Sequence, residues 1–291
     1  MVIDFIRALG NPQISFLRYA FIGGLLASVS FGVIGTYVVT RRISYLAGAI
    51  SHSILAGIGA GLYLQSKFAL LWFTPLLGAV IAGLVSSLII GLVSMYAGQR
   101  EDTVIGAIWA IGMAAGLLLL AKTPGYVDPM SYLFGNILLT TKADLWLIAG
   151  LDVLVITLGV VFYNQILAVC FDEEFAGMRG LRVGVYYLGL LFLTALTIVL
   201  LVTTVGIVMV IAMLTLPPAV AGFFGRKLWQ IMILAGLFCM LFTTLGIAIS
   251  YSYDLPTGAT IIIIAGIAYL AAVFLKRFKK KSRYSGKNQP H

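Results

Sequence analysis

A succession of long apolar stretches constrains this chain more than any other feature of its sequence. A transmembrane helix needs about 20 mainly apolar residues, and stretches near or above that length recur along the whole chain. They fall at 15–40, 46–64, 69–97, 103–121, 145–170, 183–203, 205–223, 229–251 and 257–275. Only 10% of the 291 residues are charged and the mean hydropathy is +1.07, whereas a soluble domain carries roughly 25% charged residues. The sequence therefore predicts an all-α, polytopic membrane helix bundle of eight or nine transmembrane helices.

The number of spans depends on the pair 183–203 and 205–223, which meet at Thr203 and Thr204 with no room for a free loop. So short a link at membrane depth predicts a tight turn or a broken helix. The chain then has nine spans, or eight if one segment is re-entrant. We expect one transmembrane domain over 15–275, a short surface helix over 1–14 and a basic tail over 276–291.

Basic residues favour the cytoplasmic side of a membrane, and threading the chain with its basic tail inside places 14 of the 19 there. These are Arg41, Arg42, Arg100, Arg179, Arg182, Arg226, Lys227, Lys276, Arg277, Lys279, Lys280, Lys281, Arg283 and Lys287. The N-terminus is then external. The positive charge belongs to a tail in contact with membrane lipid rather than to a nucleic-acid surface, so no nucleic-acid partner is expected.

The chain has no loop of the GxxxxGK[ST] type and no room for a nucleotide-binding fold. Any energy source must therefore be a partner subunit or an ion gradient. The sequence offers no catalytic triad or dyad. Its two cysteines, Cys170 and Cys239, lie in apolar surroundings and suggest neither a disulfide framework nor a thiolate metal site.

Polar residues inside the apolar stretches are the candidates for a transport pathway, because an ionisable group at bilayer depth costs at least about 2.5 kcal/mol. His52 lies seven residues past Tyr45, ~10 Å into the second span. With its neighbour Ser51 it predicts the lining of a translocation pathway, or else a hydrogen bond to another helix. Asp152 in the fifth stretch is a second pathway candidate, or pairs with a serine or threonine.

Asp102 opens the fourth span, where a carboxylate either extends the pathway or caps the helix through the macrodipole. Asp128 and Asp254 lie in external turns with proline or glycine. The preferred interpretation is that both residues form turns. The alternative is that they line an acidic vestibule that concentrates divalent cations. Pro217, followed by Pro218, predicts a break or kink in the seventh span and a place for a gate.

The longest charged internal stretch, about 171–183, predicts a short helix along the membrane face, acidic at its start and basic at its end. Such a helix suits the docking of a soluble partner. The residues assigned to this contact are Asp172, Glu173, Glu174, Phe175, Ala176 and Gly180.

Six motifs carry a resemblance to a known family over roughly residues 15 to 275. They are Arg41-Arg42-Ile43-Ser44-Tyr45 running to His52, Glu101-Asp102-Thr103 with Gly106, Ser131-Tyr132-Leu133-Phe134-Gly135, the Asp172-Glu173 to Gly180 loop, Val205-Gly206 leading to Leu216-Pro217, and Asp254-Leu255-Pro256-Thr257-Gly258. In this order and topology they closely resemble the permease subunits of zinc, manganese and iron ABC importers.

The resemblance implies a transport subunit, not an enzyme, in the cytoplasmic (inner) membrane of a prokaryote. Its cargo would be a divalent metal, zinc first and then manganese or iron, with no permanently bound cofactor. An extracytoplasmic metal-binding protein would deliver the ion. Two cytoplasmic ATPase subunits would drive a homodimer, or a pair with a sister permease, through the coupling helix that matches 172–180.

The sequence departs from the family pattern at two positions that bear on the cargo. The family usually has an aspartate one helical turn before the pathway histidine, and this chain has Gly48. Trp109 is apolar where some zinc-specific relatives carry a histidine. Either Asp152 or Asp102 then substitutes for the missing ligand, or the ion crosses with few protein ligands, or the cargo differs and the chain is a permease for a metal chelate. An ion-coupled secondary carrier is a separate alternative, for which His52 and Asp152 offer few ionisable groups.

Overall fold

The computed structural model describes residues 9, 15–96, 101–125, 128–135 and 137–285, and all regular elements in these ranges are helices. They are α2 (Ser15–Thr40), α3 (Ser44–Phe68), α4 (Pro75–Tyr96), α5 (Glu101–Lys122), α6 (Pro129–Phe134), η2 (Ile137–Leu139), α7 (Lys142–Val161), α8 (Tyr163–Phe171), α9 (Glu173–Met178), α10 (Val183–Val205), α11 (Ile207–Ala221), α12 (Leu228–Tyr253) and α13 (Thr257–Ser285). The predicted surface helix over 1–14 lies, apart from Leu9, outside the described residues. The start of the predicted tail continues α13 as far as Ser285.

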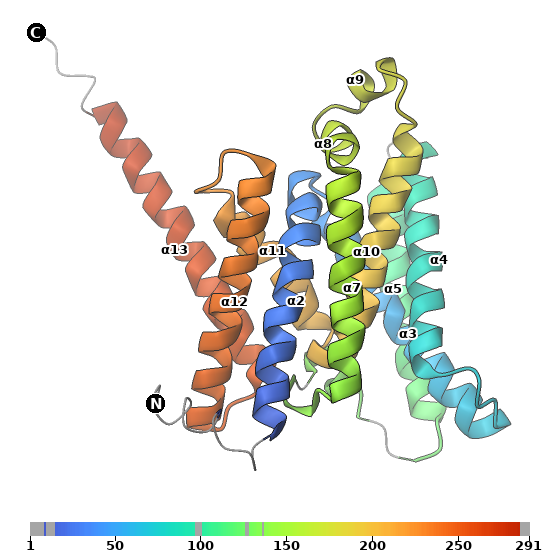
Figure 1. Cartoon of the computed structure of the whole chain (residues 1–291). Helices are drawn as coiled ribbons and strands as arrows, with labels where there is room; N and C mark the ends of the chain where they lie inside the picture. The colour runs from blue at the N-terminus through green and yellow to red at the C-terminus, as the bar shows by residue number, and fades with distance from the viewer. Residues whose placement is uncertain (1–8, 10–14, 97–100, 126–127, 136, 286–291) are drawn as a thin grey trace, which may run out of the picture.

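Eight helices in the described ranges are long and apolar enough to cross a membrane, which confirms the predicted all-α membrane bundle. The predicted span that does not reach this length is the seventh, α11, whose 15 residues reach only about 22 Å. It nevertheless returns the chain to the face on which α9 lies, because the link to α12 and the end of α13 are found at that face (Figure 1). The helix α2 begins at the opposite face, as the predicted threading requires.

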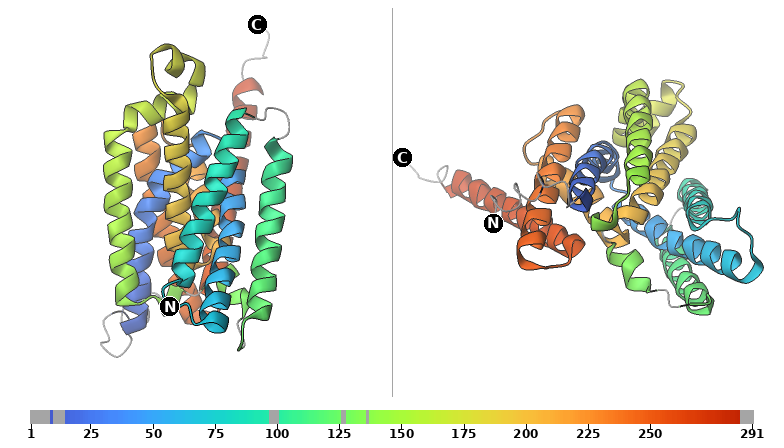
Figure 2. Two further views of the ribbon diagram at one scale, coloured as in Figure 1. Left: turned by 90° about the vertical axis from the view of Figure 1, so that its right-hand side faces the viewer. Right: turned by 60° about the horizontal axis from the view of Figure 1, so that its bottom comes forward.

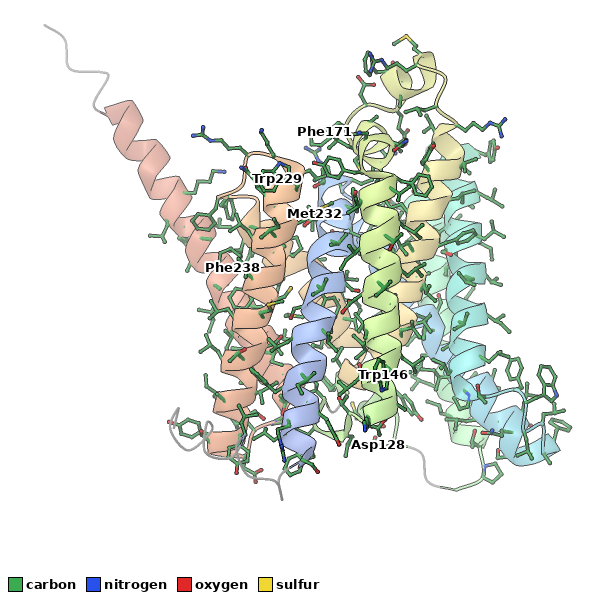
Figure 3. All side chains as sticks on the ribbon, in the orientation of Figure 1. Asp128, Trp146, Phe171, Trp229, Met232 and Phe238 are labelled. Carbon is green, nitrogen blue, oxygen red and sulfur yellow. The ribbon has the colours of Figure 1, made fainter. Side chains whose placement is uncertain are left out.

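Aromatic side chains mark both ends of the bundle. Trp146 lies near one end and Trp229 and Phe171 lie near the other, and their side chains are 75%, 48% and 70% exposed (Figure 3). Amphipathic aromatic rings favour the two membrane interfaces. The basic residues Arg179, Arg182, Arg226 and Lys227 lie at the end of the bundle that carries α9, and basic residues favour the cytoplasmic side. The face that carries α9 is therefore the cytoplasmic face, and the face with Asp128 is the external one.

Two of the helices begin or end at residues other than those predicted, and the reasons are local. The stretch 145–170 is divided at Phe162 into α7 and α8, and α8 turns across the cytoplasmic face (Figure 1). The stretch from residue 69 becomes helical only at Pro75, which suits the first position of a helix because its missing N–H needs no partner there. The Thr74 side chain accepts a hydrogen bond from the Leu77 N–H at 3.2 Å.

The pair α10 and α11 is a broken helix, as predicted. The break is Gly206, whose φ of +84° is a left-handed conformation that glycine adopts without strain. A side chain at Gly206 would overlap the backbone of Gly135, which follows α6, and one at Gly258 would lie 2.6 Å from the Phe134 carbonyl oxygen. Gly135, Gly206 and Gly258, which belong to three separate motifs, therefore pack together at the external end of the bundle.

The prolines of α11 do not end it, because the helix continues to Ala221. Of the predicted break or kink at Pro217 the structure shows no break, and the kink and the role as a gate stay predictions. Proline removes a hydrogen bond to the carbonyl four residues earlier. The Met213 carbonyl instead accepts from the Cys239 thiol at 3.8 Å, and the Leu214 carbonyl lies against Gly35.

Helix α3 is the most buried span and lies between α4 and α5 (Figure 2). Glycine makes these contacts close: a Cβ at Gly112 would lie 2.6 Å from Ser53 Cα, and one at Gly57 would overlap the Gly78 carbonyl. Membrane helices attract each other by such packing. Helix α3 is thus fixed by backbone contacts on two sides.

We expect Gly57→Ala to lower the thermal stability of the purified protein, because overpacking costs about 1–3 kcal/mol. Gly150→Ala is the matched control, since a Cβ there meets nothing within 4 Å. It should leave the melting temperature unchanged or slightly higher. Equal melting temperatures for the two variants would contradict the close α3–α4 contact.

Candidate functional site

His52 lies at the contact of α3 with α5 and is 9% exposed. Its ring stacks on the indole of Trp109, with the centroids 4.6 Å apart and the planes 18° from parallel. The Nδ1 atom is buried and has no hydrogen-bond partner among the described residues. The structure therefore shows no hydrogen bond from this nitrogen to a neighbouring helix, and its lone pair or proton is uncommitted.

Trp109 also covers Gly48, one turn before His52. A Cβ at Gly48 would lie 3.0 Å from Cζ3 of the indole. Residues four apart on a helix share a face, so the indole lies across the face from which a second ligand beside His52 would come. Trp109 itself remains 38% exposed.

Ser51 is fully buried, and its hydroxyl donates to the Ala47 carbonyl of its own helix at 2.7 Å. Ser53 does the same toward Ala49 at 2.8 Å and reaches the Ile108 carbonyl of α5 at 3.4 Å. Of the two serines beside His52, Ser53 is thus the one at the α3–α5 contact.

Asp152 lies elsewhere, at the contact of α7 with α2. Its Oδ1 accepts a hydrogen bond from the Ser30 hydroxyl at 2.6 Å, and the carboxylate is 6% exposed. Its Oδ2 is buried and has no partner among the described residues. The structure does not bring Asp152 and His52 together, because they lie at different helix contacts.

Asp102 is exposed in the first turn of α5, at the cytoplasmic end. It precedes Trp109 by seven residues, which is about two turns, so both lie on the same face of the helix. Asp102 is therefore in line with the His52–Trp109 contact but about 10 Å nearer the cytoplasm.

The two external carboxylates have turn roles. Asp128 caps α6 by accepting from the Met130 N–H at 3.0 Å. Asp254 ends α12 with a φ of +54°, a left-handed conformation that aspartate tolerates better than most residues. Both side chains are exposed on the external face, so a vestibule role remains compatible with this geometry.

The segment after α8 forms the predicted short helix α9. Asp172 caps it by accepting from the Phe175 N–H at 2.9 Å. Its end is a Schellman motif, with Leu181 N–H on the Ala176 carbonyl and Gly180 N–H on the Gly177 carbonyl. Gly180 has a φ of +79°, which explains why glycine is needed there.

The side chains of α9 divide into two sets. Ala176 is fully buried, and Glu173 forms an ion pair with Arg41 of the α2–α3 turn. Glu174, Phe175 and Met178 are exposed, Met178 by 80%. The surface open to a partner therefore combines the Glu174 carboxylate and apolar side chains with the exposed Arg179, whose guanidinium lies over the Phe175 ring, 5.2 Å from the centroid.

No group of three or more histidine, cysteine or acidic residues able to hold a metal occurs in the described part of the chain. At the cytoplasmic end of the bundle, burial raises the pKa of the Cys170 thiol to about 12, against the opposing charge of Arg41. That thiol stays protonated at neutral pH and is a poor metal ligand. A single copy therefore offers a passing metal few ligands.

Sequence reasoning missed three functional candidates. From the sequence Trp109 is only an apolar residue, Ser30 lies 122 positions from Asp152, and Arg41 is only a cytoplasmic charge and a member of the first family motif. Each acquires its role from a partner distant in sequence, so no local pattern signals it.

The fold and this site define a multi-pass membrane permease: a helical bundle with a buried histidine in its central helix and a short helix on its cytoplasmic face. Residues 13–276 match the ABC 3 transport family, and the chain belongs to this family. It is accordingly a transport component of the inner membrane without catalytic activity of its own, and ATP hydrolysis takes place in a partner chain.

Individual relatives agree with this family. The chain is 39% identical over 258 residues to a "probable metal transport system membrane protein" of Chlamydia pneumoniae, with 88% of each chain covered. It is 33% identical to the "manganese transport system membrane protein MntC" of Halalkalibacterium halodurans, over 89% of this chain and 87% of the relative. A chain of the solved structure "PsaBC from Streptococcus pneumoniae in complex with Fab" matches with a TM-score of 0.82 and 28% identity, over 94% of this chain and 95% of that one.

We expect Gly48→Val to lower the unfolding temperature, because the added methyl groups meet the indole, and Trp109→Ala to reverse most of that loss in the double variant. Residues in contact show such non-additive effects, of about 0.5–3 kcal/mol. Unfolding can be followed by dye labelling of Cys170 and Cys239, which are both buried. Trp146→Ala is the control, and rescue by it, or additive losses with Trp109→Ala, would contradict the contact.

Proposed function

We propose that this chain is the membrane-spanning subunit of an ATP-driven importer that conducts a divalent metal ion, with manganese as the first choice of cargo. The observation that carries the proposal is the buried, unpartnered Nδ1 of His52 in the central helix. A neutral imidazole nitrogen is a ligand for divalent metals that also releases them. A permease needs both properties.

The choice of manganese comes from the relatives. Two of the curated relatives above are described as metal and manganese transport proteins, and neither description names zinc. The order predicted from the sequence, zinc before manganese or iron, therefore changes. Zinc favours nitrogen and sulfur ligands, and the indole beside His52 adds none.

Two copies of the chain, or one copy with a sister permease, would supply a second set of ligands. One His52 gives one imidazole nitrogen, and a homodimer would give two. The external carboxylates Asp128 and Asp254 would face the extracytoplasmic metal-binding protein that delivers the ion. Asp102, in line with Trp109 at the inner end of α5, would attract the cation on its way to the cytoplasm.

Two ATPase subunits would dock on the cytoplasmic face at α9. Glu174 and the exposed Phe175 and Met178 offer such a partner a carboxylate and an apolar surface, and Arg179 adds a guanidinium over the Phe175 ring. Motion of the docked subunits on ATP binding would then move α9 and open the pathway.

One observation favours a second candidate, a permease for a metal chelate. The face of α3 beside His52 is closed by Trp109 rather than lined by a carboxylate. A chelate brings its own ligands and needs fewer from the protein. The uptake experiment below distinguishes the two.

We expect proteoliposomes that contain this chain with its ATPase and binding protein to take up free Mn²⁺ faster than Zn²⁺ or Fe²⁺ when ATP is supplied. His52→Ala should lower this uptake by at least about tenfold, the scale on which groups around a metal act. His291→Ala is the control, because it removes the only other histidine of the chain. Uptake is measured with radioactive or fluorescent metal probes.

Unchanged Mn²⁺ uptake in His52→Ala would remove His52 from the pathway. ATP hydrolysis without uptake of any free ion would favour the chelate permease. Preferential uptake of Zn²⁺ would restore the order predicted from the sequence.

Met178→Ser should weaken binding of the ATPase subunit by about tenfold, since burying a large apolar side chain contributes about 1.5–3 kcal/mol. Met130→Ser is the matched control, because Met130 is 58% exposed on the external face. Affinity is measured by titrating the detergent-solubilised permease with labelled ATPase. Equal affinities for both variants would contradict docking at α9.

A further inference from the structure

An ion pair joins α9 to the turn between α2 and α3. The Arg41 guanidinium contacts the Glu173 carboxylate, and the two side chains are 23% and 43% exposed. They are 132 positions apart in sequence, so only the tertiary fold brings them together. This contact is separate from the surface of α9 that is open to a partner.

The three acids at the start of α9 have different surroundings. Asp172 is committed to the helix cap, and Glu174 is exposed with no partner among the described residues. Glu173 alone of the three points back to the membrane domain. A force on α9 therefore reaches the bundle through Glu173, as well as along the chain.

Arg41 is held on its other side as well. Its guanidinium lies over the ring of Tyr187 in α10, 5.4 Å from the centroid, and the Tyr187 hydroxyl donates to Ser94 of α4 at 2.9 Å. The Nε atom of Arg41 is buried and has no hydrogen-bond partner in the described part of the chain. The guanidinium is thus confined between α9 and the inner ends of α10 and α4.

The turn that carries Arg41 is stiff. It is a Schellman motif in which Ile43 N–H bonds to the Val38 carbonyl at 3.0 Å and Arg42 N–H to the Val39 carbonyl at 3.1 Å. Ile43 is buried, and Leu46 N–H bonds to its carbonyl at 3.0 Å. Displacement of Arg41 therefore moves the start of α3, the helix that carries Gly48 and His52.

We propose that Arg41 is the positioning residue through which displacement of α9 reaches the pathway helix α3, with Glu173 as its partner. The inference rests on the proposed function, in which α9 receives the motion of the ATPase. It assigns Glu173 to transmission within the permease and leaves Glu174 and the apolar side chains for docking. The pair acts on the efficiency of coupling and not on metal binding.

The test compares Arg41→Gln, Glu173→Gln and the reversed pair Arg41→Glu with Glu173→Arg in the complete transporter. Arg42→Gln is the matched control, because Arg42 is adjacent and exposed and no ion pair of its side chain is found among the described residues. The readout is the number of metal ions imported per ATP hydrolysed, with ATPase binding measured in parallel. We expect each single variant to bind the ATPase and hydrolyse ATP but to import about tenfold fewer ions per ATP.

The reversed pair should recover most of the lost coupling, and Arg42→Gln should behave as the parent. If the Arg41–Glu173 pair only stabilised the fold, the variants would assemble or bind the ATPase less well. The number of ions imported per ATP hydrolysed would then stay unchanged in the complexes that form. Normal coupling in the single variants, or no recovery in the reversed pair, would overturn the proposal.

A second measurement separates failure of this inference from failure of the proposed function. The permease is labelled with fluorotryptophan and combined with unlabelled ATPase, and the Trp109 resonance is assigned with a Trp109→Phe variant. Because Trp109 stacks on His52, its resonance reports the α3–α5 contact without any transport. ATP should shift it in the parent and in Arg42→Gln but not in Arg41→Gln. If the parent imports no metal yet shows this pattern, the proposed cargo is wrong and the transmission from α9 to α3 through Arg41 is supported. A shift of the Trp109 resonance in Arg41→Gln would overturn that transmission.

Discussion

Close backbone contact around α3 is the interaction on which the other features of this permease depend. In a bilayer no water competes for backbone groups, so helices satisfy their own hydrogen bonds and attract one another by packing. Glycines at Gly57, Gly112 and Gly116 bring the backbones of α4 and α5 against α3. A larger side chain at these positions would separate the helices and move His52 away from Trp109. The site therefore depends on residues that carry no chemistry of their own.

The polar residues of the membrane domain fall into two kinds. Ser51 belongs to the first kind, because its hydroxyl bonds to its own helix. Asp152 and His52 belong to the second kind, because the Asp152 Oδ2 and the His52 Nδ1 are buried and have no hydrogen-bond partner among the described residues. Asp152 also accepts from Ser30 through Oδ1, and the His52 ring stacks on Trp109. A weakly held imidazole suits an ion that must leave again, since a complete ligand set would retain it.

On the cytoplasmic face, α9 is capped, closed by a Schellman motif and tied to the α2–α3 turn, so it can transmit a displacement without unfolding.

Much of the fold was predictable because membrane burial imposes it on composition. The apolar stretches predicted the spans, the basic residues predicted the orientation, and the acidic-to-basic stretch predicted α9. The departures from prediction have local physical reasons: Pro75 delays the start of α4, Phe162 separates α8 from α7, and Pro217 is tolerated within α11 because the Met213 carbonyl finds another donor. The candidate site was predictable only in part. His52 was identified as a lone polar residue in an apolar span, whereas the indole that covers it was not.

The sequence by itself determined the class of fold, the topology and the family, because hydropathy, charge and motif order act locally along the chain. The tertiary structure alone decided the pairings. It placed Trp109 over Gly48 and His52, Ser30 on Asp152, and Arg41 between Glu173 and Tyr187. It also brought Gly135, Gly206 and Gly258 to one external point. These contacts join residues far apart in sequence, and they arise only when packing of the helices fixes which faces meet.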